Sequence, residues 1–281
     1  MKIALLQTDI AWSDPQANIR RAERLMAQAG PADLYVLPEM WATGFAVKPQ
    51  GIAEEENLSP ALAWMKQTAR QKGCALSGSL AISLSSFPCP PPTAGGVRGG
   101  LGHRNRHYFV TPDALSYYDK RHLFTHGHED EHYTPGSEAV VAEWNGWRIL
   151  LQTCYDLRFP CFARYGRPRH SPLDPCPMPL EYDAIIYVAN WPERRQLAWD
   201  TLIRARAIEN QCYVIAVNRV GDDPACHYAG GSAVIDPTGR TVAECPPGEH
   251  PATADISLDR LRDMRARFRV LDDRDSIGEV F

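Results

Sequence analysis

Three reactive side chains of this 281-residue chain each follow an apolar run that is typical of a buried strand. Glu39 follows the run 34–38, Lys120 follows 115–119 and Cys154 follows 148–153. Open α/β sheets bind their ligands at the carboxyl ends of strands, so these positions are candidates for a site. Together the three could supply a proton acceptor, a positive charge and a thiol nucleophile.

Cys154 is predicted to lie at a turn between its strand and a following helix. Asp156 can cap that helix, and the first helical N–H groups would then point toward the sulfur. A helix dipole and a nearby cation would both favour the thiolate. The ordinary alternative is a buried cysteine that packs as a small hydrophobe, and Cys154 alone does not separate the two interpretations.

Glu39 and Lys120 could likewise be ordinary exposed charges. However, Glu39 comes directly after Val-Leu-Pro, which indicates a partly buried carboxyl group. Burial or a neighbouring thiolate would raise its pKa and suit it to proton transfer. Lys120 lies between an apolar strand and Leu123-Phe124, and a cation there would lower the pKa of the Cys154 thiol.

The segment from His128 to His132 spells H-E-x-x-H, the string with which zinc proteases bind their metal from one face of a helix. Here Gly127 precedes the string and Pro135-Gly136 follows it, which leaves little room for a helix. No distant third ligand stands out. We therefore expect this segment to be a loop that binds no metal.

Around these residues the chain alternates predicted strands with predicted helices. Helices are expected from Ser13-Asp14-Pro15 to Met26, over 59–72 and over 197–210. Strands are expected over 1–9, 34–38, 75–84, 107–111, 115–119, 148–153, 182–190, 213–218, 232–236 and 253–256. This alternation predicts an α/β fold, and the length allows one domain over 1–281.

Two stretches rich in proline and glycine, 86–106 and 167–179, are predicted to be inserted surface loops. The glycines of the first loop lack the strand and the Gly-Lys-Ser/Thr context of a phosphate loop.

The composition argues against several classes of partner. The formal net charge is −4 and no basic patch dominates, so nucleic acid and anionic membranes are not expected partners. No apolar run approaches the roughly 18 residues of a membrane span. Eight cysteines are scattered without a C-x-x-C pair, and the first residues are typical of a strand rather than of a signal peptide. Reduced thiols and a cytoplasmic location are expected.

The local motifs around Glu39, Lys120 and Cys154, in this order, resemble the nitrilase superfamily of carbon–nitrogen hydrolases. The resemblance extends from Met1 to about Asp275 and is greatest to the bacterial omega-amidase branch. It is carried by EMWATGF (39–45), DKRHLF (119–124), CYDLRFP (154–160), ANWPERR (189–195), RARAIENQ (204–211) and VLDDRD (270–275). The loop 86–106 is a departure, because family members usually have a short turn there, and 167–179 is a second.

The resemblance implies a four-layer α-β-β-α sandwich that pairs into homodimers, with the tail 257–281 packing on the partner subunit. It also implies amide hydrolysis through a thioester on Cys154, with Glu39 as general base and no metal or organic cofactor. Lys120 and the backbone N–H of Tyr155 would hold the oxyanion.

The family pattern includes a second glutamate just before a Pro-Gly turn, which positions the lysine. Glu129 fits that spacing better than Glu131.

The substrate would be a small molecule, the terminal amide of a 2-oxo dicarboxylic acid such as 2-oxoglutaramate. One of the two arginines in 189–195 could bind a substrate carboxylate, or both could pair with Glu193 at the surface. Arg158 is expected to be a buried structural partner of a carboxylate. The predicted substrate-binding residues are Trp41, Phe45, Asn190, Trp191, Arg194 and Arg195. Hydrolysis of nitriles or N-carbamoyl compounds, or a catalytically idle binding protein on this fold, are the alternatives.

Overall fold

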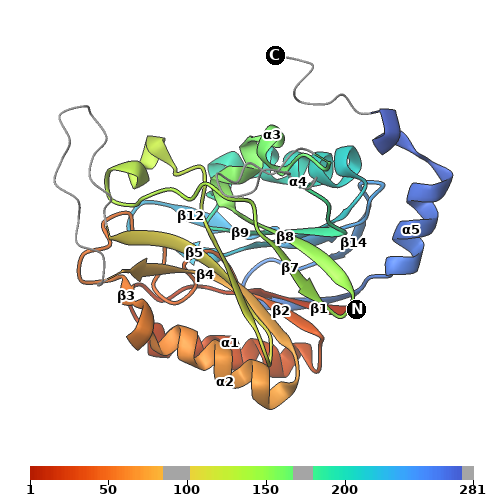
Figure 1. The fold of residues 1–281 in the computed structure, drawn as a ribbon. Helices are drawn as coiled ribbons and strands as arrows, with labels where there is room; N and C mark the ends of the chain where they lie inside the picture. Colours follow the sequence, from red (N-terminus) through yellow and green to blue (C-terminus); the bar gives the residue numbers. More distant parts are fainter. Residues whose placement is uncertain (85–101, 167–179, 274–281) are drawn as a thin grey trace.

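The computed structural model describes residues 1–84, 102–166 and 180–273. Two β-sheets face each other and helices cover their outer surfaces, which gives the four layers α-β-β-α (Figure 1). The predicted architecture is therefore confirmed. The loop 167–179 and most of the loop 86–106 lie outside the described residues.

The first sheet has the strand order β15-β1-β2-β4-β5-β6, with β3 paired to β4. Its strands β1, β2 and β4 run parallel, and β5, β6 and β15 pair antiparallel to their neighbours. The strands are β1 (Lys2–Gln7), β2 (Leu34–Val36), β3 (Glu54–Glu55), β4 (Ala75–Ser83), β5 (His103–Val110), β6 (Leu115–Asp119) and β15 (His250–Asp255).

The second sheet has the order β14-β13-β10-β9-β8-β7, and its central strands β8, β9 and β10 are parallel. A separate hairpin, β11-β12, follows β10. These strands are β7 (Val141–Trp144), β8 (Trp147–Thr153), β9 (Ala184–Ala189), β10 (Tyr213–Asn218), β11 (Val220–Asp222), β12 (His227–Ala229), β13 (Ala233–Ile235) and β14 (Thr241–Glu244).

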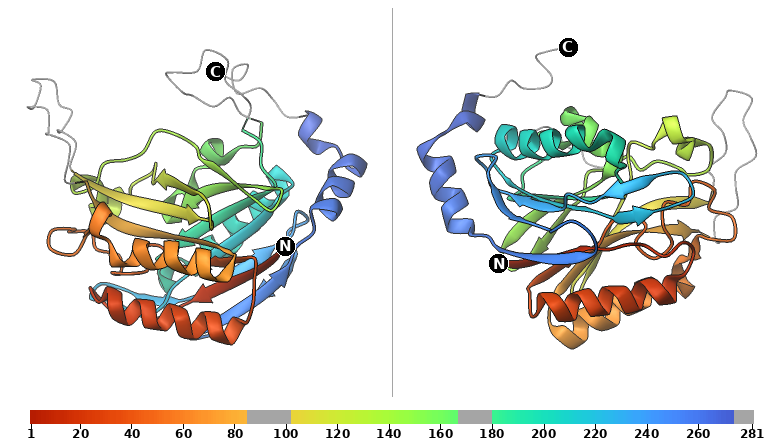
Figure 2. Two further views of the ribbon diagram at one scale, coloured as in Figure 1. Left: turned by 60° about the horizontal axis from the view of Figure 1, so that its bottom comes forward. Right: turned by 180° about the vertical axis from the view of Figure 1, so that it is seen from behind.

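Helices α1 (Pro15–Ala29) and α2 (Pro60–Lys72) cover the first sheet, and α3 (Pro160–Ala163) and α4 (Gln196–Asn210) lie over the second (Figures 1 and 2). Asp14 caps α1 by accepting a hydrogen bond from the backbone N–H of Ala17 at 2.9 Å. One hydrophobic core lies between the two sheets. A second lies between the first sheet and its helices, and a third lies between the second sheet and its helices. Within the described ranges, no helix is long and apolar enough to cross a membrane.

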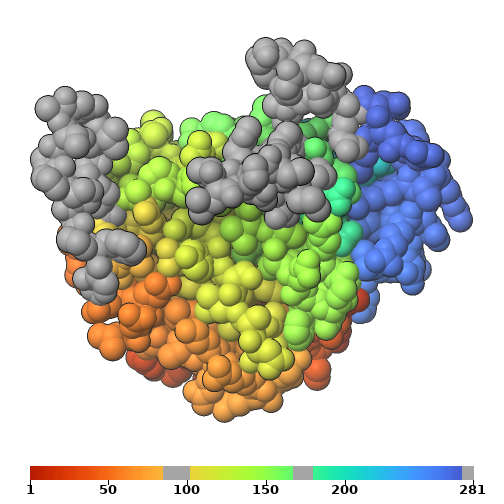
Figure 3. Space-filling view, viewed as in Figure 1, coloured from red at the N-terminus to blue at the C-terminus, as the bar shows by residue number. Residues whose placement is uncertain are grey.

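The C-terminal helix α5 (Leu258–Arg267) lies at one end of the sandwich, next to the N-terminus (Figures 1 and 3). Leu261 is buried in the core between the sheets, and Arg265 donates a hydrogen bond to the Tyr182 carbonyl oxygen at 2.9 Å. The tail up to the 3-10 turn η6 (Val270–Asp273) therefore packs in part on its own chain. Its contact with a partner subunit stays a prediction.

The structure corrects two expectations about local elements. Strand β5 begins at His103, so residues 103–106 are part of the sheet and not of a loop. The run His-Arg-Asn-Arg hid this strand, because polar residues are not the usual signal of a buried strand; here Arg106 is buried and pairs with Asp119 at 2.7 Å. The expected helix directly after Cys154 is instead the 3-10 turn η4 (Cys154–Arg158), and α3 begins only at Pro160.

Candidate active site

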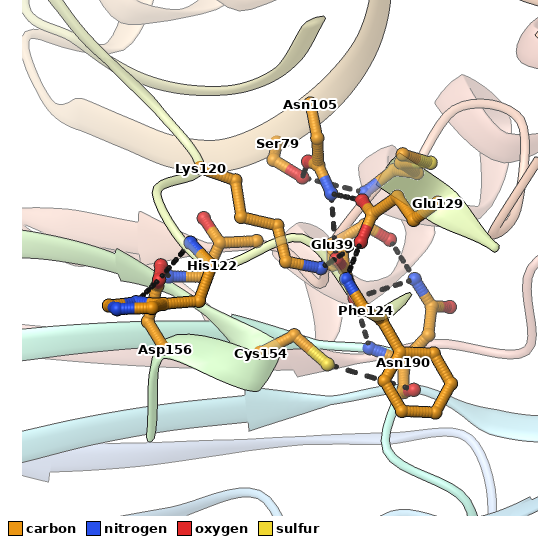
Figure 4. Close-up of polar contacts among 12 residues, drawn as sticks. Glu39, Ser79, Asn105, Lys120, His122, Phe124, Glu129, Cys154, Asp156 and Asn190 are labelled. Carbon is orange, nitrogen blue, oxygen red and sulfur yellow. Dashed lines mark hydrogen bonds and ion pairs between the residues drawn. The ribbon is translucent and has the colours of Figure 1, made fainter. Parts of the chain in front are cut away.

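Cys154 lies at the end of β8, as the first residue of η4. Its φ of +47° is in the left-handed region, which is strained for a residue with a side chain. The thiol Sγ lies 3.9 Å from the backbone carbonyl oxygen of Asn190, which follows the neighbouring strand β9 (Figure 4). The sharp turn thus directs the thiol toward the edge where the parallel strands of the second sheet end.

Asp156 ties this turn to the segment that follows β6. One carboxylate oxygen accepts hydrogen bonds from the backbone N–H of Thr153 at 2.9 Å and from the Tyr118 hydroxyl at 2.8 Å. The other accepts from the backbone N–H of His122 at 2.9 Å, and His122 Nδ1 lies 2.8 Å from it. Asp156 is fully buried, so it fixes two loops from opposite sheets relative to each other.

Lys120 follows β6 and lies between two carboxylates (Figure 4). Its Nζ is 2.9 Å from Glu39 Oε1 and 2.8 Å from Glu129 Oε2. All three side chains are buried. A buried cation with two hydrogen-bonded carboxylates is fixed in position, which suits a preorganised polar site.

Glu129, and not Glu131, is the glutamate that contacts Lys120. It opens the 3-10 turn η3 (Glu129–Glu131), and its Oε2 also accepts a hydrogen bond from the backbone N–H of Phe124 at 2.7 Å. Glu131 is exposed at the wall of the cavity that contains Cys154, and it pairs with His128 at 3.1 Å. His128 has a left-handed backbone and only a 3-10 turn follows it, so the H-E-x-x-H string does not form an α-helix.

Two asparagines hold the carboxylate of Glu39. Asn105 on β5 donates through Nδ2 to Glu39 Oε1 at 2.8 Å and to Glu129 Oε1 at 3.0 Å. Asn190 donates its backbone N–H to Glu39 Oε2 at 2.9 Å and its side-chain amide to the Glu39 carbonyl oxygen at 2.7 Å. Asn190 was predicted for substrate binding, whereas Asn105 was missed because it was assigned to the loop 86–106.

A cavity of about 940 Å³ opens in front of the thiol. Its wall contains most of the residues predicted to bind substrate, namely Phe45, Asn190, Trp191, Arg194 and Arg195, together with Cys154 and Tyr155. Trp41 was predicted there wrongly. It is buried in the core under α2, with its ring 5.3 Å from that of Trp64, because the turn after Glu39 directs it into the first sheet's outer core.

Comparisons with known proteins agree with this geometry. The model of the carbon-nitrogen hydrolase family matches residues 2–266. The chain belongs to this family. It is 38% identical to the omega-amidase YafV of Yersinia enterocolitica over 98% of the chain and 97% of that protein. It is 32% identical to the 2-oxoglutaramate amidase of Bacillus subtilis over 96% of each. The chain is therefore an amide-hydrolysing enzyme.

Solved structures support the family and the fold. The CN-hydrolase superfamily protein XC1258 of Xanthomonas campestris, which carries an arsenic adduct in its active site, is 42% identical with a TM-score of 0.84, over 99% of this chain and 98% of that one. Saccharomyces cerevisiae Nit3 has the same fold at 24% identity and a TM-score of 0.77, over 95% and 94% of the two chains.

The charges of the hydrolase's site differ from the expectation for two groups. Burial alone would raise the pKa of Glu39, but the charge of Lys120 and the hydrogen bonds from Lys120, Asn190 and Asn105 outweigh it, so this pKa lies below its ordinary value. Burial and then the negative charge of Glu39 raise the pKa of the Cys154 thiol well above its ordinary value. The resting pair is thus a thiol beside a carboxylate, not the helix-stabilised thiolate that was predicted.

Arg158 was predicted wrongly as a buried partner of a carboxylate. Because η4 turns as a 3-10 helix, its guanidinium reaches the cavity wall, 4.9 Å above the Trp191 ring. Arg195 lies 5.1 Å above the Phe124 ring in the same cavity. The ion pairs among the described residues include none to Arg158, Arg194 or Arg195, although two acidic residues, Glu131 and Asp223, also line the cavity. The hydrolase therefore presents unpaired cations near its thiol.

Proposed function

We propose that the hydrolase cleaves the terminal amide of small dicarboxylic acid monoamides, with 2-oxoglutaramate as the representative substrate. The observation that carries this proposal is the pair of unpaired guanidinium groups, Arg158 and Arg195, in the cavity that contains Cys154. A carboxylate that enters a partly dry cavity needs a charge-assisted partner, because leaving it unpaired costs several kcal/mol. The names of the omega-amidase and 2-oxoglutaramate amidase relatives point to the same substrate class.

Acylation begins when the Glu39 carboxylate takes the thiol proton and Sγ of Cys154 attacks the amide carbon. The carbonyl π electrons move to oxygen, and the resulting oxyanion is held by Lys120 Nζ and the backbone N–H of Tyr155. Glu39 then gives its proton to the amide nitrogen, the C–N bond breaks, and ammonia leaves a thioester on Cys154.

Deacylation uses the same groups with water in place of the thiol. Glu39 takes a proton from water as the water oxygen attacks the thioester carbon. The C–S bond then breaks, the sulfur of Cys154 regains its proton, and the acid is released. Glu129 stays hydrogen-bonded to Lys120 throughout and keeps the ammonium directed at the reacting oxygen.

The resting protonation states fit this sequence. A thiolate generated only when substrate is present is protected from oxidation, and a Glu39 with a lowered pKa is ionised and ready to accept a proton. Burial alone would lower the pKa of Lys120, but the charges of Glu129 and Glu39 outweigh burial and raise this pKa well above its ordinary value. The ammonium group therefore stays charged.

The proposal is tested by ammonia release from 2-oxoglutaramate and from a neutral amide of similar length, with wild-type protein and with Arg158→Met. We expect the wild type to prefer the charged amide. The variant should raise KM for 2-oxoglutaramate about tenfold, which corresponds to about 1.4 kcal/mol, and leave the neutral amide unchanged. Equal losses on both amides would place the carboxylate contact elsewhere. Preferred release of acid from a nitrile or an N-carbamoyl compound would contradict the proposed substrate class.

We further infer a homodimer, formed in part by the C-terminal tail. Phe268 and Val270, just after α5, are exposed in the single chain at 66% and 39% of their surface, and such apolar side chains favour a protein contact. Light scattering of the purified protein measures this directly, and a monomer at micromolar concentration would contradict it. Residence in the cytoplasm stays a prediction.

A further inference from the structure

Asn105 occupies an unusual electrostatic position in the active site. It lies on β5 and is buried, and the two N–H groups of its side-chain amide are directed to two different carboxylates (Figure 4). Those carboxylates, Glu39 and Glu129, share a single ammonium group, that of Lys120. The buried cluster therefore contains two negative charges and one positive charge.

Such a cluster resists full ionisation. Glu39 Oε1 and Glu129 Oε1 are separated by no more than the sum of two hydrogen-bond lengths, 2.8 and 3.0 Å, because both contact Asn105 Nδ2. Two carboxylates in one buried site repel each other, which favours a proton on one of them. Burial and the charge of Glu39 raise the pKa of Glu129 above its ordinary value, although the charge of Lys120 opposes this. Glu39 could not accept the thiol proton if it already held a proton.

The amide of Asn105 opposes this repulsion without adding charge. Its N–H groups bond more strongly to the oxygens of a carboxylate than to those of a neutral carboxyl group, so they favour the ionised form of both side chains. A second ammonium in that place would compete with Lys120 for the same oxygens. A water molecule in that place could rotate freely, whereas the amide belongs to the side chain of a residue on β5, so the protein fixes its position.

The orientation of the amide is set by its oxygen. Ser79 on the adjacent strand β4 donates its hydroxyl to Asn105 Oδ1 at 2.9 Å. The Ser79 oxygen in turn accepts the backbone N–H of Met40 at 2.9 Å, directly after Glu39. This chain of hydrogen bonds keeps the oxygen of the amide away from the carboxylates and its nitrogen toward them.

We propose that Asn105 is a positioning residue that keeps Glu39 and Glu129 ionised together around Lys120, so that Glu39 is free to act as the base. The inference rests on the proposed role of Glu39 but not on the identity of the amide substrate.

The test compares Asn105→Ala and Asn105→Asp with the wild type in full pH profiles of kcat and kcat/KM. We expect Asn105→Ala to lower kcat at pH 7 at least tenfold and to change KM less than threefold. Because the base must be ionised, the loss of activity on the acid side should move to higher pH, by about one unit. Asn105→Asp places a third carboxylate in the cluster and should lower kcat further.

Two other variants separate this role from a structural one. Ser79→Ala removes the hydroxyl that orients the amide and that accepts the Met40 N–H, and it leaves Asn105 itself in place. It should shift the acid limb in the same direction by a smaller amount. Asn210→Ala removes a buried asparagine that bonds to the Arg206 carbonyl oxygen and the Tyr165 N–H, away from the site. It should lower the melting temperature and leave the pH profile in place.

An unchanged acid limb in Asn105→Ala, or wild-type turnover in Asn105→Asp, would overturn the inference. If neither Asn105 variant folds, Ser79→Ala decides, and its unshifted profile would overturn it as well. The pH profile of Cys154 alkylation by iodoacetamide reports on the same carboxylates without substrate. A shift there in a protein that hydrolyses no amide would keep this inference and reject the proposed function.

Discussion

The reaction centre and the mouth of its cavity differ in how their charges are matched. At the centre, Glu39, Lys120 and Glu129 are buried and paired with one another. At the mouth, within the described residues, Arg158 and Arg195 lie over aromatic rings and pair with no carboxylate. The charges at the centre are thus matched within the chain, whereas these two guanidinium groups have no carboxylate partner among the described residues. On the proposed function, the centre performs the chemistry and the arginine-bearing wall selects the substrate.

The two regions also differ in their structural support. The centre draws residues from both sheets, with Glu39, Asn105 and Lys120 from the first and Cys154 and Asn190 from the second (Figure 4). The arginines of the mouth lie on 3-10 turns, Arg158 at the end of η4 and Arg195 at the end of η5 (Glu193–Arg195). Substitutions at the centre should therefore change kcat, and substitutions at the mouth should change KM.

The largest effect is expected from Cys154→Ala. No other group at the centre can form the thioester, so kcat/KM should fall at least about a thousandfold while the fold is retained. Ammonia release and circular dichroism measure the two outcomes. The matched control is Cys161→Ser, an exposed cysteine on α3, which should stay within twofold of the wild type. If Cys161→Ser loses as much activity as Cys154→Ala, the assignment of Cys154 as the nucleophile is wrong.

Asp156→Asn should produce the next largest loss. The amide cannot accept all the hydrogen bonds that the carboxylate accepts from Thr153, Tyr118 and His122, so the Cys154 turn would shift relative to Lys120. We expect kcat to fall about tenfold to a hundredfold, because small displacements of reacting groups have effects of this size. A variant that loses melting temperature but keeps its kcat would show that Asp156 serves stability alone.

A moderate effect is expected from acid. Since the pKa of Glu39 is lowered, its carboxylate stays ionised until the pH falls below the ordinary range for glutamate. kcat/KM for a neutral amide should therefore change less than about twofold between pH 7 and 5.5, and should fall only below that. An acid limb near pH 7 would mean that Lys120 does not offset the burial of Glu39.

The smallest effect is expected at the H-E-x-x-H string. His128→Ala removes an exposed side chain that pairs with Glu131 at the cavity wall. Activity should stay within about twofold, because exposed ion pairs contribute little. Incubation with EDTA should have no effect either. Inactivation by EDTA that zinc reverses would show that the histidines, and not only Glu129, take part in the site.

The sequence sufficed where a residue type, a strand end and a recognisable local motif coincide. Glu39, Lys120 and Cys154 met these conditions, as did α1 and α2 with their Ser or Asp caps and their proline starts. Family resemblance, rather than periodicity, supplied the four layers. Which Glu of the neighbouring pair faces Lys120 depended on the backbone of η2 (Thr125–Gly127) and η3, and only the structure fixes that.

Asn105 and Arg158 show where the sequence was insufficient. Asn105 is a polar residue in a polar strand, and its importance comes from Glu39 and Glu129, which are distant in sequence. Arg158 was misplaced because its direction depends on whether the chain after Cys154 winds as an α-helix or as a 3-10 turn. A 3-10 helix has about 3.0 residues per turn and an α-helix about 3.6, so the side chain at a given position points in a different direction in the two.

The left-handed backbone of Cys154 has a consequence for the evolution of the protein. Glycine adopts that conformation freely, whereas a residue with a Cβ is destabilised there by about 1 kcal/mol or more. Cys154→Gly should therefore unfold at a higher temperature than Cys154→Ala, although both are inactive. Selection for stability alone would favour glycine at position 154. The presence of cysteine there therefore indicates selection for turnover at some cost in stability.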